Sequence, residues 1–167
     1  METNDLRGVQ EPLKQQYRQH PGSALVTLHA EGELGMGVTC SVQTGQAMVR
    51  AGLHPATGGD GLSLCSGDML LQALVACAGV TLGAVASSLG LDVTGSVRAE
   101  GDLDFRGTLA VDKETPVGFR AIRLSFDLRS PADDGQLATL LRLTERYCVV
   151  YQTLASIPDL SVSHTVS

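Results

Sequence analysis

The sequence predicts a single α+β domain, in which blocks of strands are separated by helices. A chain of 167 residues suits one domain, and a composition of 43% hydrophobic and 18% charged residues is typical of a chain that folds. Strand-like alternation occurs in two blocks on either side of one long apolar segment, with no regular βα repeat. This order favours α+β over a parallel α/β fold.

The N-terminal third predicts a short helix followed by three strands. Residues 11–20 have the spacing of an amphipathic helix, with Pro12 in its first turn. Alternating apolar and polar side chains then predict strands over residues 24–31, 37–43 and 47–53. We expect the last two strands to pair as a hairpin around Thr44 and Gly45, and residues 54–61, HPATGGDG, to form a loop.

Residues 69–91 carry no charged side chain and are long enough to cross a bilayer. Polar residues and glycines interrupt this segment, and no aromatic or basic belt flanks it closely, so we predict a buried core helix rather than a membrane span. The helix should begin near Ser66, whose hydroxyl can cap it, with Asp68 in the first turn. Gly90 should end it.

The C-terminal part predicts further strands around a second helix. Residues 92–110 contain two strand-like runs. Residues 119–128 alternate most clearly and predict a half-buried strand, whose apolar face carries Ile122, Leu124, Phe126 and Leu128. After a polar turn, residues 136–155 predict the second helix, and residues 160–166 predict a last strand.

The long helix is apolar on every side, so one sheet of this size cannot cover it. Small residues recur along the helix and would permit close approach of another helix or subunit: Ala73, Ala76, Gly79, Gly83 and Ala86. We therefore expect a homodimer in which a second copy supplies the missing cover.

The charge balance excludes several classes of partner. The chain has 12 basic and 18 acidic residues, a net charge of −6 and no basic cluster longer than a pair, which disfavours nucleic acid as a partner.

Residues 1–20 are polar and contain no apolar signal segment, so we expect a cytoplasmic protein that does not bind membranes. In that compartment the four cysteines are expected to be free or reactive rather than a disulfide framework.

Two cysteines lie on core-facing stripes of the two predicted long helices, Cys77 and Cys148. They could face one another and close a disulfide if their Cα atoms come within about 7 Å. Each one alone is also typical of a small buried packing residue. Cys40 is expected to pack on its strand, and the role of Cys65 stays open, since about 18 Å of helix separates it from Cys77.

A nucleophilic Cys77 needs an activating group from elsewhere in the fold. It lies about three turns into its helix, where the helix dipole has faded, so a cation would have to lower the pKa of its thiol. The candidate cations are Arg50, Arg106 and Arg146. No C-x2-C or H-x3-H pair, P-loop or GxGxxG spacing is present, so we expect neither a metal ion nor a cofactor.

Five stretches stand out along the chain: HPATGGDG, CSGDMLLQALVACAGVTL, DFRGTL, VGF and TERYCVVYQTL. Together with the closing strand they resemble the OsmC/Ohr family of osmotically inducible and organic hydroperoxide resistance proteins, over residues 24–166. The resemblance implies an α+β homodimer whose two chains are intertwined, with central helices buried between β-sheets. It also implies an OsmC-like domain over residues 23–167, preceded by a helical extension over residues 1–22.

The resemblance implies a thiol peroxidase that serves oxidative stress defence. Cys77 would reduce an organic hydroperoxide or hydrogen peroxide and become a sulfenic acid, Cys148 would resolve it, and a dithiol would reduce the disulfide. The alternative is a non-peroxidase dimer of the same fold that binds a small apolar or thiol ligand at the subunit interface.

Two features depart from the family's pattern. The family glutamate ten residues before the reactive cysteine is Gly67 here, and an arginine of an early strand is absent from residues 29–37. Asp68 is adjacent to the glutamate position but rotated by about 100° on a helix. Asp68 and Arg106 are therefore the candidate supporting residues.

Overall fold

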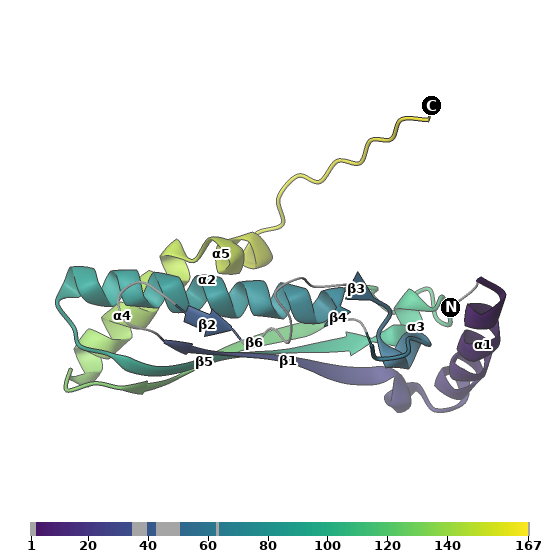
Figure 1. Cartoon of the computed structure of the whole chain (residues 1–167), viewed down its shortest axis with the longest axis horizontal. Helices are drawn as coiled ribbons and strands as arrows, with labels where there is room; N and C mark the ends of the chain where they lie inside the picture. Colours follow the sequence, from purple (N-terminus) through teal and green to yellow (C-terminus); the bar gives the residue numbers. More distant parts are fainter. Residues whose placement is uncertain (1–2, 35–39, 43–50, 63, 167) are drawn as a thin grey trace.

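The structure is a computed structural model that describes residues 3–34, 40–42, 51–62 and 64–166, without the side chains of residues 3–7, 9, 10, 28–34 and 40–42. A long helix, α2, lies along one face of an antiparallel sheet, and α4 and α5 pack against α2 (Figure 1). The N-terminal helix α1 lies at one end of the molecule, beside the short helix α3.

The main sheet has the order β2-β1-β5-β6, and each neighbouring pair is antiparallel. Its strands are β1 (Leu25–Leu34), β2 (Cys40–Val42), β5 (Thr94–Asp104) and β6 (Ala121–Arg129). A second, two-stranded sheet pairs β3 (Ala51–Gly52) with β4 (Leu64–Cys65) in parallel. The predicted hairpin between the second and third strands is therefore wrong for their described parts, which belong to different sheets, while its turn at Thr44 and Gly45 lies outside the described residues.

The helix α2 (Ser66–Leu89) confirms the prediction of a long core helix. Asp68 lies in its first turn, and Gly90 ends it with φ 66°, donating its N–H to the carbonyls of Ala86 and Ser87. The predicted cap is wrong, because Cys65 is the N-cap residue and gives no side-chain cap bond, so Ser66 is already helical.

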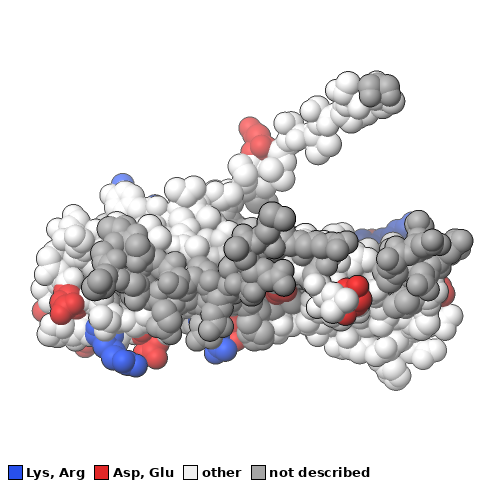
Figure 2. Space-filling model, viewed as in Figure 1, with Lys and Arg blue, Asp and Glu red and all other residues white. Residues whose placement is uncertain are grey.

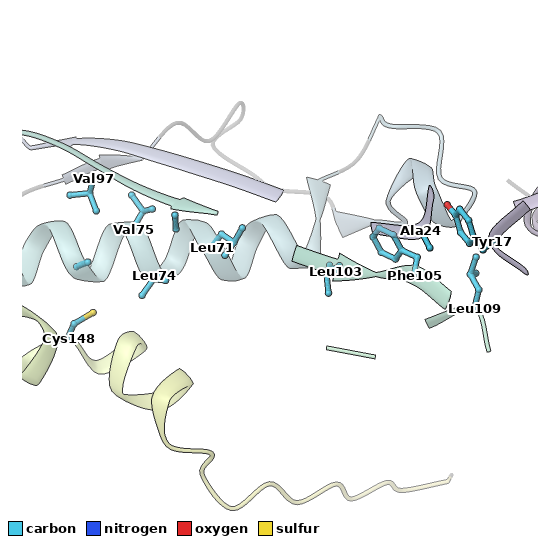
Figure 3. Packing of buried hydrophobic residues seen from close by; sticks show 12 residues of the cluster. Tyr17, Ala24, Leu71, Leu74, Val75, Val97, Leu103, Phe105, Leu109 and Cys148 are labelled. Atoms are coloured by element: carbon cyan, nitrogen blue, oxygen red, sulfur yellow. The ribbon is translucent and has the colours of Figure 1, made fainter. Parts of the chain in front are cut away.

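One face of α2 forms the centre of the core. Its side chains pack with Val97 and Ala99 of β5, and both of those residues are fully buried (Figure 3). The buried residues of α2 are Leu71, Leu74, Val75, Ala78, Gly79, Leu82 and Ala86. Within the described residues, α2 is the one helix long and apolar enough to cross a membrane, a property it shares with core helices of soluble proteins.

The other face of α2 stays partly open within the single chain. Met69, Leu70 and Val80 are each 37–39% exposed. In the view of Figure 2, side chains of both charges are scattered along the sheet side of the molecule. The small residues for which the sequence predicted a close approach lie elsewhere on α2, and two of them, Gly79 and Ala86, are buried within the single chain.

Three other predicted elements differ from the structure. The N-terminal helix α1 (Thr3–Gln19) begins earlier than predicted, so Pro12 lies inside it rather than in its first turn. The two strand-like runs of residues 92–110 are one strand, β5, and a short helix, α3 (Phe105–Thr108). The chain turns there because the buried Asp104 carboxylate accepts the backbone N–H of Arg106 at 3.1 Å and so caps α3.

The predicted second helix is two helices, α4 (Asp134–Tyr147) and α5 (Val149–Ala155). The predicted last strand is absent, because residues 160–166 are exposed and without regular structure, and the segment extends away from the body (Figure 1). A strand needs a partner edge for its backbone groups, and nothing in the described part of the single chain lies beside this segment.

Candidate active site

Cys77 and Cys148 come together between α2 and the junction of α4 with α5. Cys77 is half-buried on α2 and packs against the main core cluster, which includes the fully buried Cys148. The Cys148 side chain points toward α2 (Figure 3), and the two thiols lie close enough for each to shift the pKa of the other. Both are free thiols, so the structure is that of the reduced pair.

The helix break at Cys148 supplies further donors to Cys77. Cys148 has an extended backbone, with φ −72° and ψ 107°. It is the C-cap residue of α4 and also the N-cap residue of α5. Its N–H donates to the Thr144 carbonyl at 2.9 Å, and this is the last backbone hydrogen bond of α4. The next two amides, of Val149 and Val150, donate to the Cys77 sulfur instead of continuing the helix.

These contacts set the protonation of Cys77. Burial raises the pKa of its thiol, but four hydrogen bonds that favour the thiolate outweigh burial, so the pKa is lowered overall. The donors are the Val150 amide, the Cys148 thiol, the Thr81 hydroxyl and the Val149 amide. Cys77 is therefore the thiol of the pair that ionises first.

Cys148 shows the opposite behaviour. Burial is the main cause that raises the pKa of its thiol, to about 11, and the neighbouring Cys77 sulfur adds to this effect. The Tyr151 amide, which donates to the Cys148 sulfur at 3.5 Å, opposes it only in part. The pair thus holds one thiol prone to ionise beside one that stays protonated at neutral pH.

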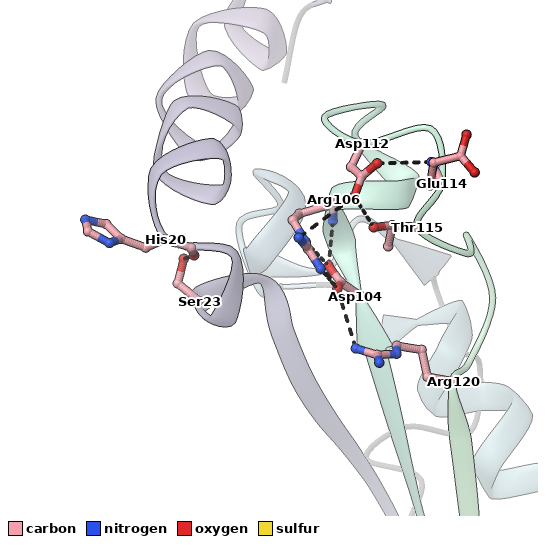
Figure 4. Close-up of polar contacts among 8 residues, drawn as sticks. All are labelled: His20, Ser23, Asp104, Arg106, Asp112, Glu114, Thr115 and Arg120. Atoms are coloured by element: carbon pink, nitrogen blue, oxygen red, sulfur yellow. Dashed lines mark hydrogen bonds and ion pairs between the residues drawn. The ribbon is translucent and has the colours of Figure 1, made fainter.

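The candidate cations lie elsewhere or outside the described residues. Arg106 is bound by the buried Asp104, with 2.6 Å between its Nη2 and a carboxylate oxygen, and lies 3.9 Å from Asp112 (Figure 4). Arg146 lies over the ring of Tyr147, 5.6 Å from its centroid. Neither is among the groups that act on the pKa of Cys77, and Arg50 is not described.

The candidate supporting carboxylate, Asp68, also lies away from Cys77. Asp68 is half-buried in the first turn of α2, about 13 Å of helix rise before Cys77. It is not among the groups that act on Cys77. Its position at the helix N-terminus gives Asp68 a favourable interaction with the helix dipole.

The other two cysteines lie apart from the pair. Cys65 is a half-buried free thiol at the N-cap of α2, and the side chain of Cys40 is outside the described part. Among the described residues, no group of three His, Cys, Asp or Glu side chains is placed to hold a metal ion.

Two of the grooves among the described residues lie along α2. The α5 groove, of about 530 Å³, lies between α2, α5 and β6 and is lined by Leu74, Ile122 and Tyr151 among others. The α4 groove, of about 540 Å³, lies between α2 and α4, where Thr81 and Tyr147 form part of its lining. Both are mainly apolar and suit a small apolar molecule, but neither Cys77 nor Cys148 is part of their lining.

Sequence reasoning missed the donors around Cys77. Thr81 follows Cys77 by one helical turn, a spacing that places both on one face and could have identified it. The amides of Val149 and Val150 carry no side-chain signature. Only the weak helix preference of two successive valines hints at a break there.

Comparisons with known proteins place this geometry in a family. A sequence profile of the OsmC-like protein family matches residues 58–163, whereas no curated protein matches the chain. The OsmC-like hydroperoxide resistance protein from Jannaschia sp. CCS1 has a similar structure, with a TM-score of 0.56 and 16% identity, over 86% of this chain and 95% of that one. The OsmC-like protein from Mycoplasma pneumoniae has a TM-score of 0.54 and 15% identity, over 80% and 86% of the two chains.

At such low identity the two structures show the fold alone, and they confirm the predicted α+β, OsmC-like architecture. The boundary predicted at residue 22 lies outside the profile match and stays a prediction. Because the profile covers more than half of the sequence, the chain belongs to the OsmC-like family.

Proposed function

We propose that the protein is a cysteine-based thiol peroxidase that reduces organic hydroperoxides or hydrogen peroxide in oxidative stress defence. The observation that carries the proposal is the contact between two free thiols whose pKa values are shifted in opposite directions. Membership of the OsmC-like family and the likeness to a hydroperoxide resistance protein support a peroxide-related role. Asp68, in the first turn of α2, and Arg106, paired with Asp104, stay candidate supporting residues.

In the first step, the Cys77 thiolate attacks one oxygen of the peroxide bond. An S–O bond forms, the O–O bond breaks, and the leaving alkoxide takes a proton to become an alcohol. The peroxide is reduced and Cys77 is oxidised to a sulfenic acid. The four donors around Cys77 favour the thiolate that this step needs.

In the second step, the Cys148 sulfur attacks the sulfur of the Cys77 sulfenic acid. An S–S bond forms, the S–O bond breaks, and the departing hydroxide takes the Cys148 proton and leaves as water. Oxidation removes the negative charge of Cys77, which is one of the causes that raise the pKa of Cys148. Cys148 thus becomes easier to ionise once Cys77 has reacted. A dithiol then restores both thiols and is itself oxidised to a disulfide.

We further propose that the protein acts as a homodimer in the reducing cytoplasm. The open face of α2 supports this, because Met69, Leu70 and Val80 leave an apolar stripe that a second copy would cover. Light scattering should give twice the chain mass of 17.5 kDa. Ala84→Glu places a charge on the same stripe and should yield monomers, whereas a monomeric parent protein would contradict the proposal.

The peroxidase proposal is tested with the purified full chain, cumene hydroperoxide or hydrogen peroxide, and dithiothreitol or dihydrolipoamide as reductant. Cys77→Ser should abolish peroxide loss. Cys148→Ser should complete one turnover and then stall as a sulfenic acid, which dimedone labelling and mass spectrometry detect. Cys65→Ser is the matched control and should keep the parent rate. Turnover by Cys77→Ser at the parent rate would refute the mechanism.

The ligand-binding alternative is favoured by one observation, the apolar α5 groove of about 530 Å³. A cavity of this size suits a small apolar molecule. No peroxide loss with any reductant, together with a co-purified small molecule in native mass spectrometry, would favour this function over the peroxidase.

A further inference from the structure

The α5 groove combines an apolar lining with a single charged side chain. Leu74, Ile122 and Leu154 belong to its lining. Arg120, which directly precedes β6, is the one charged residue among the described residues that line it. Sites for small molecules have this composition, because apolar walls bind the bulk of a ligand and a few polar groups fix its orientation. The groove therefore suits a ligand with an apolar body and a negatively charged group.

Arg120 is the last member of a row of alternating charges (Figure 4). The row runs from Asp112 through Arg106 and the buried Asp104 to Arg120. Arg106 donates to the Asp104 carboxylate at 2.6 Å from Nη2 and at 3.0 Å from Nε, whereas 3.8 Å separates the Arg120 Nη1 from the same carboxylate. A distance of 3.8 Å is too long for a hydrogen bond, so Arg106 rather than Arg120 satisfies the buried carboxylate.

The guanidinium donors of Arg120 are thus left for another acceptor. Among the described residues, its side chain makes the long ion pair with Asp104 and no hydrogen bond, and it is 49% exposed. The Asp102 carboxylate also interacts with the charge of Arg120, but two hydrogen bonds from Arg123 bind it. Because a guanidinium binds a carboxylate through two parallel N–H donors, a carboxylate of a ligand would continue the alternation of charge at Arg120.

The groove is open beside Arg120. Gly118 belongs to the same part of the lining, and a Cβ at this position would meet no atom within 4 Å. The groove volume of about 530 Å³ lies in the range of small-molecule sites. A charged group of a ligand can therefore stay close to solvent beside Arg120, which limits the cost of its desolvation, while the apolar body is covered by the rest of the lining.

We propose that the α5 groove binds an apolar molecule that carries a carboxylate, with the carboxylate on Arg120 and the apolar body between α2, α5 and β6. The proposal rests on the ligand-binding function of this groove and gives its ligand class. It does not depend on peroxidase chemistry, because neither Cys77 nor Cys148 lines the groove. Leu70 belongs both to the lining and to the stripe that a second copy would cover, so the ligand would lie beside the proposed subunit interface.

The test is isothermal titration calorimetry of the purified full chain with octanoate and with 1-octanol, which have the same chain length and differ in charge. The parent protein should bind octanoate more tightly than 1-octanol. The net charge of −6 would by itself disfavour the anion, so this preference has to come from a local cation. Added salt should weaken the binding of octanoate but not that of 1-octanol, because salt screens only the charged contact.

The variants identify the cation. Arg120→Gln removes the charge-assisted hydrogen bonds, so it should weaken octanoate binding about tenfold and change 1-octanol binding less than about twofold. Arg129→Gln is the matched control, because it removes the same charge from an exposed position of β6 outside the lining. It should leave both affinities unchanged. Circular dichroism checks that each variant is folded.

Unchanged octanoate affinity in folded Arg120→Gln, or an equal loss in Arg129→Gln, would overturn the proposal. If Arg120→Gln does not fold, the parent protein decides, because octanoate binding no tighter than 1-octanol binding would overturn it as well. Binding of 1-octanol alone would overturn the carboxylate preference while the ligand-binding function stands. The titration contains no peroxide, so octanoate binding through Arg120 in a protein that consumes no peroxide would support this site and refute the peroxidase.

Discussion

Leu71 of α2 offers a direct test of how the helix is held against the sheet. Its side chain is fully buried in the main core cluster. One of its methyl carbons lies 3.3 Å from the point that a Cβ on Gly101 would occupy, and the Phe119 ring covers the same point. Gly101 has no side chain that could move into a space left by Leu71. We predict that Leu71→Ala leaves a cavity that closes poorly.

The size of the effect follows from the carbons removed. Leu→Ala deletes three carbon groups, and at about 0.8 kcal/mol for each the loss of transfer free energy is about 2.4 kcal/mol. The cavity adds to this loss, so we expect the free energy of unfolding to fall by about 3 to 4 kcal/mol. The matched control is Leu62→Ala, at a leucine that is 87% exposed and lies outside the proposed dimer stripe, and it should cost less than about 0.5 kcal/mol.

The assay is urea unfolding followed by circular dichroism, at one fixed protein concentration because a dimer would make stability concentration-dependent. Leu71→Ala should lower the urea midpoint strongly while the slope of free energy against urea stays unchanged. Equal midpoints for Leu71→Ala and Leu62→Ala would refute the reasoning, because they would mean that burial against Gly101 contributes nothing.

Three further predictions concern ionisable groups. Hydrogen bonds from the Arg106 guanidinium lower the pKa of Asp104 in the folded protein, so the ionised carboxylate stabilises the fold above its unfolded pKa of about 3.9, and this contribution is lost as pH falls through the folded pKa. The difference in urea midpoint between the parent protein and Asp104→Asn should therefore become smaller below about pH 4. Tyr17→Phe removes a 2.6 Å hydrogen bond from the tyrosine hydroxyl to the Ala56 carbonyl and should lower the free energy of unfolding, measured with urea, by about 1 kcal/mol. An unchanged free energy of unfolding would mean that this hydrogen bond does not stabilise the fold. Cys77→Ser should lower the alkylation midpoint of Cys148 from its raised value, because one cause of that shift is removed; an unchanged midpoint would mean that burial alone sets it.

Local sequence signals predicted the elements that depend on local chemistry. Asp68 and Gly90 mark the two ends of α2 because a helix dipole and a left-handed cap act within one turn. The alternation over residues 119–128 predicted β6, since its two faces meet different surroundings along its whole length.

Features that depend on distant parts of the chain were not predictable from local pattern. The hairpin expectation failed because β2 pairs with β1, whereas β3 pairs in parallel with β4, on the other side of the 54–61 loop. Residues 160–166 have the alternation of a strand but no edge to pair with in the single chain. Periodicity alone extended the second helix across Cys148, where the contact with α2 is tertiary.

The candidate site was predictable to a similar degree. The apolar stripes of the two predicted long helices identified Cys77 and Cys148, because both stripes had to face the core. The expectation of a nearby cation stays a prediction, and the main causes that lower the pKa of Cys77 include backbone amides at the helix break. Such amides belong to every residue type, so no sequence pattern indicates them.

The break between α4 and α5 gives the chain a joint at the position of its proposed resolving thiol. Within a continuous helix, Cys148 could reach another sulfur only if the whole rod slid or tilted. At a joint, rotation about the backbone of a single residue moves the sulfur, while Gln152 ties the two segments together through a 2.8 Å bond from its side-chain amide to the Glu145 carbonyl. Oxidation and reduction of the pair would then require movement at one residue, and the core face of α2 could keep its packing through the cycle.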